Sequence, residues 1–176
     1  MNKVISNKYQ ESYIEETLPN GLKVVLWQKK GYEKSYFMMT TPLGALDIEQ
    51  VDADGKAFQF EPGTAHFLEH KMFEDEDKDV MNLFSEMGAN VNAFTSYTET
   101  AYHFTTSEDP EAPLNLLLDF VQRLTISEES VEKEKGIIIQ ELQMYQQMSD
   151  SRLMKLSHHF FMSIRCVLMS AAHRNQ

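Results

Sequence analysis

The sequence predicts an α+β fold: a mostly antiparallel sheet with helices packed on one face, incomplete at its C-terminal end. Three observations lead to this prediction. Apolar segments bounded by turn residues are typical of strands, segments with apolar residues three and four positions apart are typical of helices, and the two kinds come in blocks. With 176 residues, 42% of them apolar, the chain is long enough to bury the core of one domain.

Four segments are predicted to be strands because β-branched, aromatic and apolar residues lie between turn residues. They are residues 22–27, 35–41, 90–96 and 100–106. An Asn-Gly turn precedes the first strand, since this dipeptide tolerates the positive φ angles of a tight turn. A short turn at residues 97–99 joins the last two strands, which are therefore expected as a pair.

Four further segments are predicted to be helices, each opened by a capping residue. Their expected first residues are Gly63 or Thr64, Asp79, Asp109 followed by Pro110, and Ser127. The second helix is expected to end at Met87, where Gly88 supplies a left-handed terminator. The third is expected to bury one apolar side: Leu114, Leu117, Leu118, Val121 and Leu124.

Composition excludes several function classes. The formal net charge of −11 disfavours a nucleic-acid surface, so no nucleic acid is expected as a partner. No apolar segment approaches the roughly 20 residues of a membrane span, and residues 1–8 lack the apolar core of a signal peptide. We therefore expect no membrane partner and a cytoplasmic location. Cys166 is the only cysteine, which excludes an internal disulfide and a metal site of several thiolates.

Residues 63–74 contain the pattern His-x-x-Glu-His on a predicted helix. At 100° per residue, His66, Glu69 and His70 fall within an arc of roughly 100°, so one metal ion could face all three. Two histidines one turn apart are well suited to zinc, and a glutamate beside them that is not a ligand can accept a proton from water. The alternative is a surface helix with two incidental histidines, and a metal site still needs a third ligand.

The helix that starts at Ser127 carries two glutamates in its apolar stripe, which is Glu134, Ile138, Glu141, Tyr145 and Met148. A carboxylate that faces a core needs a partner, because desolvating it unpaired costs several kcal/mol, and a zinc ion held by the two histidines would be one. Glu134 and Glu141 lie about 10.5 Å apart along the axis, so only one can be a ligand. In the alternative, both are solvated and pair with Lys133 or Lys135.

Four segments together resemble the zinc peptidases of the insulinase and pitrilysin type, a family with an inverted zinc motif that includes the mitochondrial processing peptidases. They are residues 18–24, 63–70, 88–96 and 134–141, in the family's order. The resemblance covers roughly residues 13–155. The continuation Lys71-Met72-Phe73-Glu74 and the acidic insertion around residues 52–55 are most similar to a bacterial cytoplasmic branch of the family.

The resemblance implies a zinc endopeptidase. Zn²⁺ is the implied cofactor, with His66, His70 and Glu141 as its ligands. Glu69 is the implied catalytic base, and Glu134 is implied to support the site from outside the ligand set. The implied function is hydrolysis of peptide bonds in short or unfolded peptides by a metal-activated water.

The implied substrate site is a strand edge. Asn92, Ala93 and Phe94 correspond to the family's edge strand, whose free backbone groups pair with an extended peptide. Members of the family are built from repeated halves that close around the substrate. The expected partners are therefore the peptide and a homologous partner subunit or a missing C-terminal half.

The resemblance covers part of one such half. Residues 1–156 are expected to form a truncated N-terminal zinc-peptidase domain, and residues 157–176 a divergent tail, frame-shifted or disordered. Two alternatives to an active endopeptidase stay open: a catalytically incomplete zinc-binding fragment or subunit that needs a partner half for turnover, and a protein with structural zinc only. Three protein ligands disfavour the second alternative, because structural zinc sites usually have four.

Overall fold

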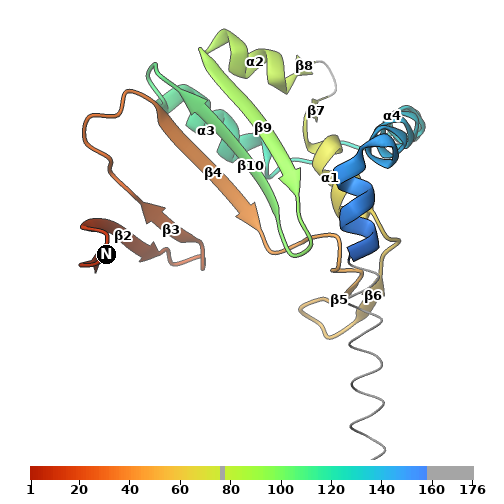
Figure 1. The fold of residues 1–176 in the computed structure, drawn as a ribbon, viewed down its shortest axis with the longest axis horizontal. Coiled ribbons are helices and arrows are strands. Elements are labelled where there is room, and N and C mark those ends of the chain that lie inside the picture. The colour runs from red at the N-terminus through yellow and green to blue at the C-terminus, as the bar shows by residue number, and fades with distance from the viewer. Residues whose placement is uncertain (76–77, 158–176) are drawn as a thin grey trace, which may run out of the picture.

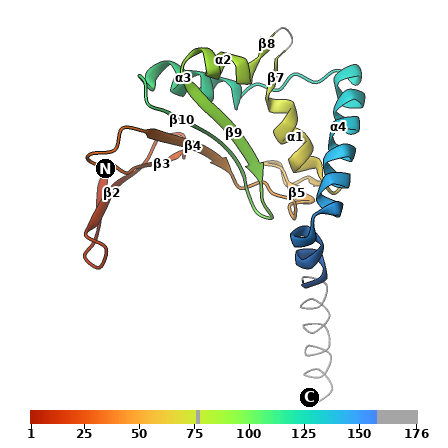
Figure 2. The same ribbon diagram turned by 45° about the horizontal axis from the view of Figure 1, so that its top comes forward.

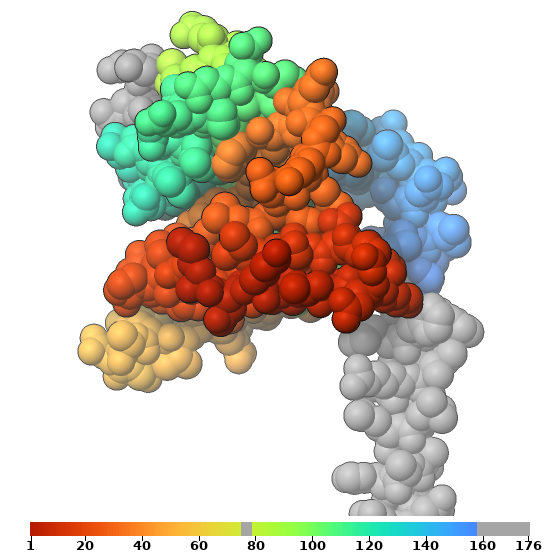
Figure 3. All heavy atoms as spheres, turned by 90° about the vertical axis from the view of Figure 1, so that its left-hand side faces the viewer, coloured from red at the N-terminus to blue at the C-terminus, as the bar shows by residue number. Residues whose placement is uncertain are grey.

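The computed structural model describes residues 1–75 and 78–157, and its α+β architecture confirms the predicted fold class (Figure 1). The main sheet has three antiparallel strands in the order β4 (Ser35–Thr41), β10 (Thr100–Thr106) and β9 (Ala89–Thr95). A second antiparallel sheet consists of β1 (Asn2–Ser6), β2 (Glu11–Thr17) and β3 (Lys23–Leu26). Figure 3 shows these N-terminal strands as a separate layer beside β4.

Two short hairpins and the helices make up the rest of the described chain. The hairpins are β5 (Glu49–Val51) with β6 (Ala57–Gln59), and β7 (Glu74–Asp75) with β8 (Lys78–Asp79). The helices are α1 (Thr64–Met72), α2 (Val80–Glu86), α3 (Glu111–Phe120) and α4 (Glu128–Gln147). Residues 149–157 are helical as well. None of the helices in the described ranges combines the length and the apolar character that crossing a membrane requires.

The core lies between the main sheet and the helices α2 and α3. Phe84 of α2, Phe104 of β10 and Leu117 of α3 are almost completely buried. Their cluster also contains Val80, Ala89, Tyr102 and Phe120. Burying a side chain of this size contributes about 1.5–3 kcal/mol, so this layer anchors the fold. Figures 1 and 2 show α1 and α4 side by side beyond β9, at the edge of the sheet.

The helix-capping residues predicted from the sequence for α2 and α4 are found at the ends of these helices in the structure. The Asp79 carboxylate accepts hydrogen bonds from the backbone of the first turn of α2, and Gly88 follows that helix with φ +69°. Ser127 caps α4 by accepting a hydrogen bond from the N–H of Ser130 at 3.1 Å. Both helices therefore begin where the sequence predicted.

Six of the described strands were not predicted: the four strands of the two short hairpins, and β1 and β2 of the second sheet. The segments Asn2–Ser6 and Glu11–Thr17 contain charged and polar residues at positions where a strand signal needs β-branched or aromatic ones. They form strands because their backbone groups pair with neighbouring strands: β2 pairs with β1 on one side and with β3 on the other. Pairing with a distant segment is not visible in a local pattern.

The predicted buried side of α3 was wrong in part. Leu118 and Leu124 are exposed, at 37% and 47%, whereas Pro113 and Phe120 are buried together with Leu117. The helix ends at Phe120, so Leu124 lies outside it, and the buried side follows positions 113, 117 and 120. Pro110, and not Asp109, holds the cap position, while the Asp109 carboxylate accepts a hydrogen bond from the N–H of Glu111 at 3.1 Å.

The apolar stripe predicted on α4 is buried only in its first turns. Glu134 is 4% exposed, but Tyr145 and Met148 are 46% and 49% exposed. The burial of the stripe therefore ends before α4 does, and the two glutamates lie in its more buried part.

Candidate metal centre

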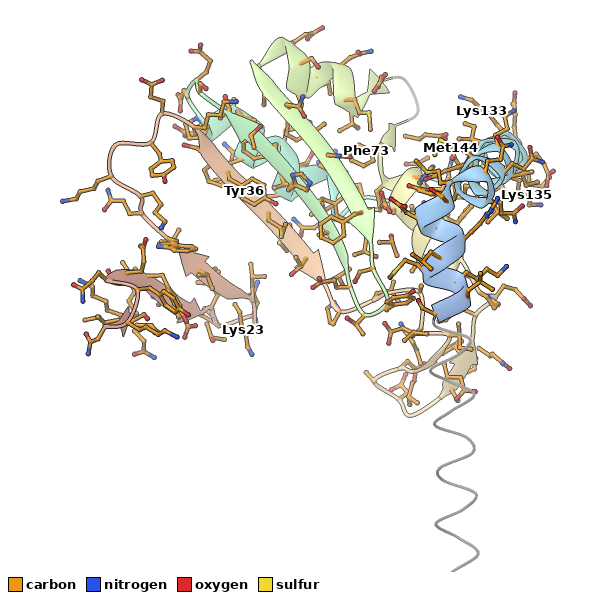
Figure 4. The ribbon with its side chains drawn as sticks, in the orientation of Figure 1. Lys23, Tyr36, Phe73, Lys133, Lys135 and Met144 are labelled. Atoms are coloured by element: carbon orange, nitrogen blue, oxygen red, sulfur yellow. The ribbon has the colours of Figure 1, made fainter. Side chains whose placement is uncertain are left out.

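Helix α1 owes its start to a glycine. Gly63 occupies the cap position with φ +94°, a left-handed conformation that strains residues with a Cβ, and its C=O accepts a hydrogen bond from the N–H of Phe67 at 2.9 Å. At the other end lies Phe73, which is labelled in Figure 4. Its ring packs on Tyr102 and Phe120, with centroids 5.9 and 5.3 Å apart. These contacts fix both ends of the helix that carries the His-x-x-Glu-His pattern.

The three side chains that the resemblance names as ligands converge where α1 and α4 meet. Nε2 of His66 lies 3.1 Å from Nε2 of His70, and each of these nitrogens lies 3.5 Å from Oε2 of Glu141. All three side chains are partly buried. Imidazole nitrogen and carboxylate oxygen bound to a tetrahedral zinc ion at about 2.0–2.1 Å lie about 3.3 Å apart, so the residues fit zinc in both chemistry and spacing.

Glu134 contacts His70, and it forms no ion pair with a lysine among the described residues. Its Oε1 lies 2.7 Å from Nδ1 of His70, and its side chain is almost fully buried. A neutral His70 that donates its Nδ1 proton to this carboxylate keeps the lone pair of Nε2 free for a metal. The alternative in which the α4 glutamates pair with lysines does not hold for Glu134; Lys135 instead forms an ion pair with Glu132.

Glu69 lies beside the cluster with a partner of its own. Only 7% of the residue is exposed, and its Oε2 accepts a hydrogen bond from Oγ1 of Thr95 at 2.7 Å. Burial, and after it the nearby Glu69 carboxylate, raises the pKa of the Tyr102 phenol above its ordinary value. Thr95 was not predicted as a site residue; the available signal was a polar residue at a position where β9 turns its apolar side chains inward.

The cluster opens onto a groove of about 1820 Å³ between α1, α4 and β9. The two helices contribute the titratable side chains of its lining, which are His66, Glu69, His70, Glu134 and Glu141. Strand β9 contributes Asn92, Ala93, Phe94 and Thr95. Strand β9 is at the edge of its sheet, as the resemblance implied for residues 92–94. The N–H of Ala93 donates to Oδ1 of Asn92 at 2.9 Å. A strand edge that pairs with no further strand of the described sheet thus borders the same groove as the histidines.

A His-x-x-Glu-His helix packed against a glutamate-bearing helix, beside an antiparallel sheet, is the arrangement expected of an inverted-motif zinc peptidase. The chain belongs to the insulinase family, peptidase family M16, because the model of that family matches residues 59–167.

Two similar proteins support the assignment to this family. The chain is 47% identical over 145 residues to the "uncharacterized zinc protease YmfH" of Bacillus subtilis, covering 82% of this chain and 34% of that protein. It is 38% identical over 86 residues to the human mitochondrial-processing peptidase subunit beta, covering 46% of this chain and 18% of that subunit. The chain thus spans about a third or less of the length of these relatives.

A solved structure extends the likeness to the fold. The crystal structure of a putative M16-like peptidase from Alicyclobacillus acidocaldarius matches with a TM-score of 0.74 and 41% identity. The match covers 80% of this chain and 33% of that one. The family match ends at residue 167, beyond Ser157, where the resemblance was expected to stop. Residues 158–176 lie outside the described residues, so the division into 1–156 and 157–176 stays a prediction.

Proposed function

We propose that this chain forms the zinc-binding part of an endopeptidase that hydrolyses peptide bonds in short or unfolded peptides. The observation that carries the proposal is the convergence of His66, His70 and Glu141 from two helices, with the buried Glu69 beside them. Three protein ligands leave room for a water or a substrate atom, as in catalytic zinc sites. The names of the relatives as zinc protease and processing peptidase support the same proposal.

Each side chain has a distinct task in this proposal. His66, His70 and Glu141 hold Zn²⁺, and Glu134 keeps His70 in the tautomer that binds it. When bound, zinc acts as a Lewis acid that acidifies water and polarises a peptide carbonyl. Glu69 accepts the proton of the attacking water and returns it to the leaving amine.

The substrate binds to β9 as an added strand in this proposal. The backbone of Asn92, Ala93 and Phe94 offers N–H and C=O groups at the sheet edge, next to the histidines. The peptide first displaces the Asn92 side chain from the N–H of Ala93. Strand addition recognises the main chain of any extended peptide, which favours short or unfolded substrates over folded proteins.

A second candidate function is a zinc-binding fragment or subunit that turns over substrate only with a homologous partner half. The observation that favours it is the apolar side of α4 along the groove, where Ile137, Leu142 and Tyr145 are each more than 40% exposed. Exposed apolar side chains around an open groove suit contact with a second protein surface. A cytoplasmic location, suggested by the composition, is part of both proposals.

Replacing Glu69 with glutamine tests the catalytic assignment. The variant should bind zinc like the unchanged protein and lose about 10²- to 10⁴-fold in turnover of a fluorogenic peptide, because the amide cannot accept the proton. Glu86→Gln, an exposed change on α2, is the matched control and should leave turnover intact. Full peptidase activity in Glu69→Gln would refute the role of Glu69. Zinc binding without turnover in the unchanged chain, and turnover once a partner half is added, would select the second candidate.

A further inference from the structure

We propose that Thr95 is a positioning residue whose hydroxyl holds the Glu69 carboxylate in the orientation for proton transfer. This inference rests on the function proposed above for Glu69. The contact that carries it is the 2.7 Å hydrogen bond from Oγ1 of Thr95 to Oε2 of Glu69, which joins β9 to α1 across 26 positions of sequence. A buried carboxylate needs hydrogen-bond donors, and Thr95 supplies one.

The position of Thr95 on its strand aims the hydroxyl at α1. Ala89, Val91 and Ala93 pack against the core under the sheet, and side chains two residues apart on a strand share a face. Thr95 therefore lies on the face that the helices cover. Its branched side chain has little rotational freedom about χ1, so the hydroxyl is held where the strand puts it.

The end of β9 is fixed to the loop that follows β4. Thr95 lies opposite Thr100 in the β9–β10 register, and the hydroxyl of Thr100 donates to the carbonyl oxygen of Leu43 at 2.7 Å. Each hydroxyl has a single proton to donate. Thr95 donates its hydrogen bond to Glu69, and Thr100 donates its own to the carbonyl oxygen of Leu43. The 3.3 Å separation of the two hydroxyl oxygens is then a close contact between two anchored groups.

Two backbone hydrogen bonds reinforce this anchor. The N–H of Ala45 donates to the carbonyl of Ser96 at 2.9 Å, and the N–H of Leu46 donates to the carbonyl of Tyr97 at 3.0 Å. The turn that follows Thr95 is therefore bound to the 43–47 loop at several points. Thr95 is thus a fixed donor rather than a mobile one, which is what orienting a base requires.

The effect of losing this donor is on orientation. Without it, the Glu69 carboxylate can rotate among side-chain conformers, and a displacement of about 1 Å in a reacting group can cost about 10²-fold in rate. The zinc ligands and the strand edge keep their own contacts. The chemical step should therefore suffer more than substrate or zinc binding.

The test compares Thr95→Val, which keeps the shape and removes the hydroxyl, with Thr95→Ser, which keeps the hydroxyl. We expect Thr95→Val to lower kcat roughly 10- to 100-fold with little change in KM and an unchanged zinc content. Thr95→Ser should recover most of the lost kcat, which a purely structural role of the threonine would not produce. Thr40→Val, an exposed threonine on β4, is the matched control and should leave kcat unchanged.

A second readout needs no turnover. In crystal structures of the two zinc-bound variants, the Glu69 carboxylate should remain on residue 95 in Thr95→Ser and leave it in Thr95→Val. An unmoved Glu69 in Thr95→Val, an unchanged kcat, or no recovery in Thr95→Ser would overturn the inference. If the unchanged protein shows no turnover at all, the proposed function fails for this chain, while the Glu69 position still decides the role of Thr95.

Discussion

At the scale of the residue, the use of both ring nitrogens of His70 explains why two of the glutamates on α4, Glu134 and Glu141, face α1. Nδ1 faces Glu134 at 2.7 Å, while Nε2 faces His66 at 3.1 Å and Glu141 at 3.5 Å. A spacing of seven residues puts Glu134 and Glu141 on the same side of the helix, two turns apart. Glu141 can therefore be the third metal ligand, while Glu134 orients His70.

Replacing Glu134 with glutamine should weaken zinc binding about 10- to 100-fold, because the amide loses the charge that stabilises the Nδ1–H of His70. Competition with a chromophoric chelator measures the affinity. Glu132→Gln is the control on the same helix, since Glu132 is exposed and pairs only with Lys135 in the described structure. Equal zinc affinity in Glu134→Gln and the unchanged protein would show that the contact with His70 does not support the metal site.

The sequence predicted the candidate metal ligands and Glu69, but it did not predict the contact that Glu69 receives from β9. Spacing on a helix groups His66, Glu69 and His70, and the resemblance adds Glu141, which the structure brings to the same place. Thr95 was missed because a threonine in a strand is common and its partner lies on another element. Lys71 was also missed: a lysine is normally solvated, but here it is fully buried and pairs with Glu74.

At the scale of the element, the loop between β4 and the β5–β6 hairpin connects the strand edge to the helix of the histidines. It binds the β9–β10 turn through backbone hydrogen bonds and then leads, through the hairpin, to Gly63 and α1. Gly44 allows this contact because it has no side chain. A Cβ there would lie 2.4 Å from the backbone nitrogen of Thr98, closer than real atoms approach.

Gly44→Ala should lower the free energy of unfolding by about 1–3 kcal/mol, because the loop or the turn has to move away to make room. Gly136→Ala is the matched control: a Cβ there meets open space within α4, and the change should raise stability by up to about 1 kcal/mol. Urea unfolding followed by circular dichroism measures both. Equal stability of Gly44→Ala and the unchanged protein would contradict the close packing of this loop.

Elements with a strong local pattern were predicted within a residue or two, and elements held by distant pairing were not. The apolar segments 35–41 and 100–106 became β4 and β10 with the same bounds. Helix α4 begins where the Ser127 cap predicted. The strands β1 and β2 were missed because they depend on pairing with each other and with β3, to which their own composition contributes little.

At the scale of the whole molecule, the candidate site exists only where three separate parts meet. Helix α1 supplies the histidines and Glu69, α4 supplies Glu134 and Glu141, and β9 supplies the edge and Thr95. Figures 1 and 2 show α1 and α4 next to β9, at one edge of the main sheet, while β2 and β3 lie beyond β4, at the opposite edge. The packing of α4 on α1 therefore brings Glu141 to His66 and His70.

The most direct test of the account is the zinc affinity of Glu141→Ala, measured by competition with a chelator. The unchanged chain should bind one zinc ion. Loss of Glu141 should weaken binding by more than about 100-fold, beyond the effect of losing a residue that only orients a ligand. Gln140→Ala, an exposed neighbour on α4, should bind zinc like the unchanged protein. A Glu141→Ala variant that still binds one zinc ion with unchanged affinity would contradict the proposal that α1 and α4 share one metal site.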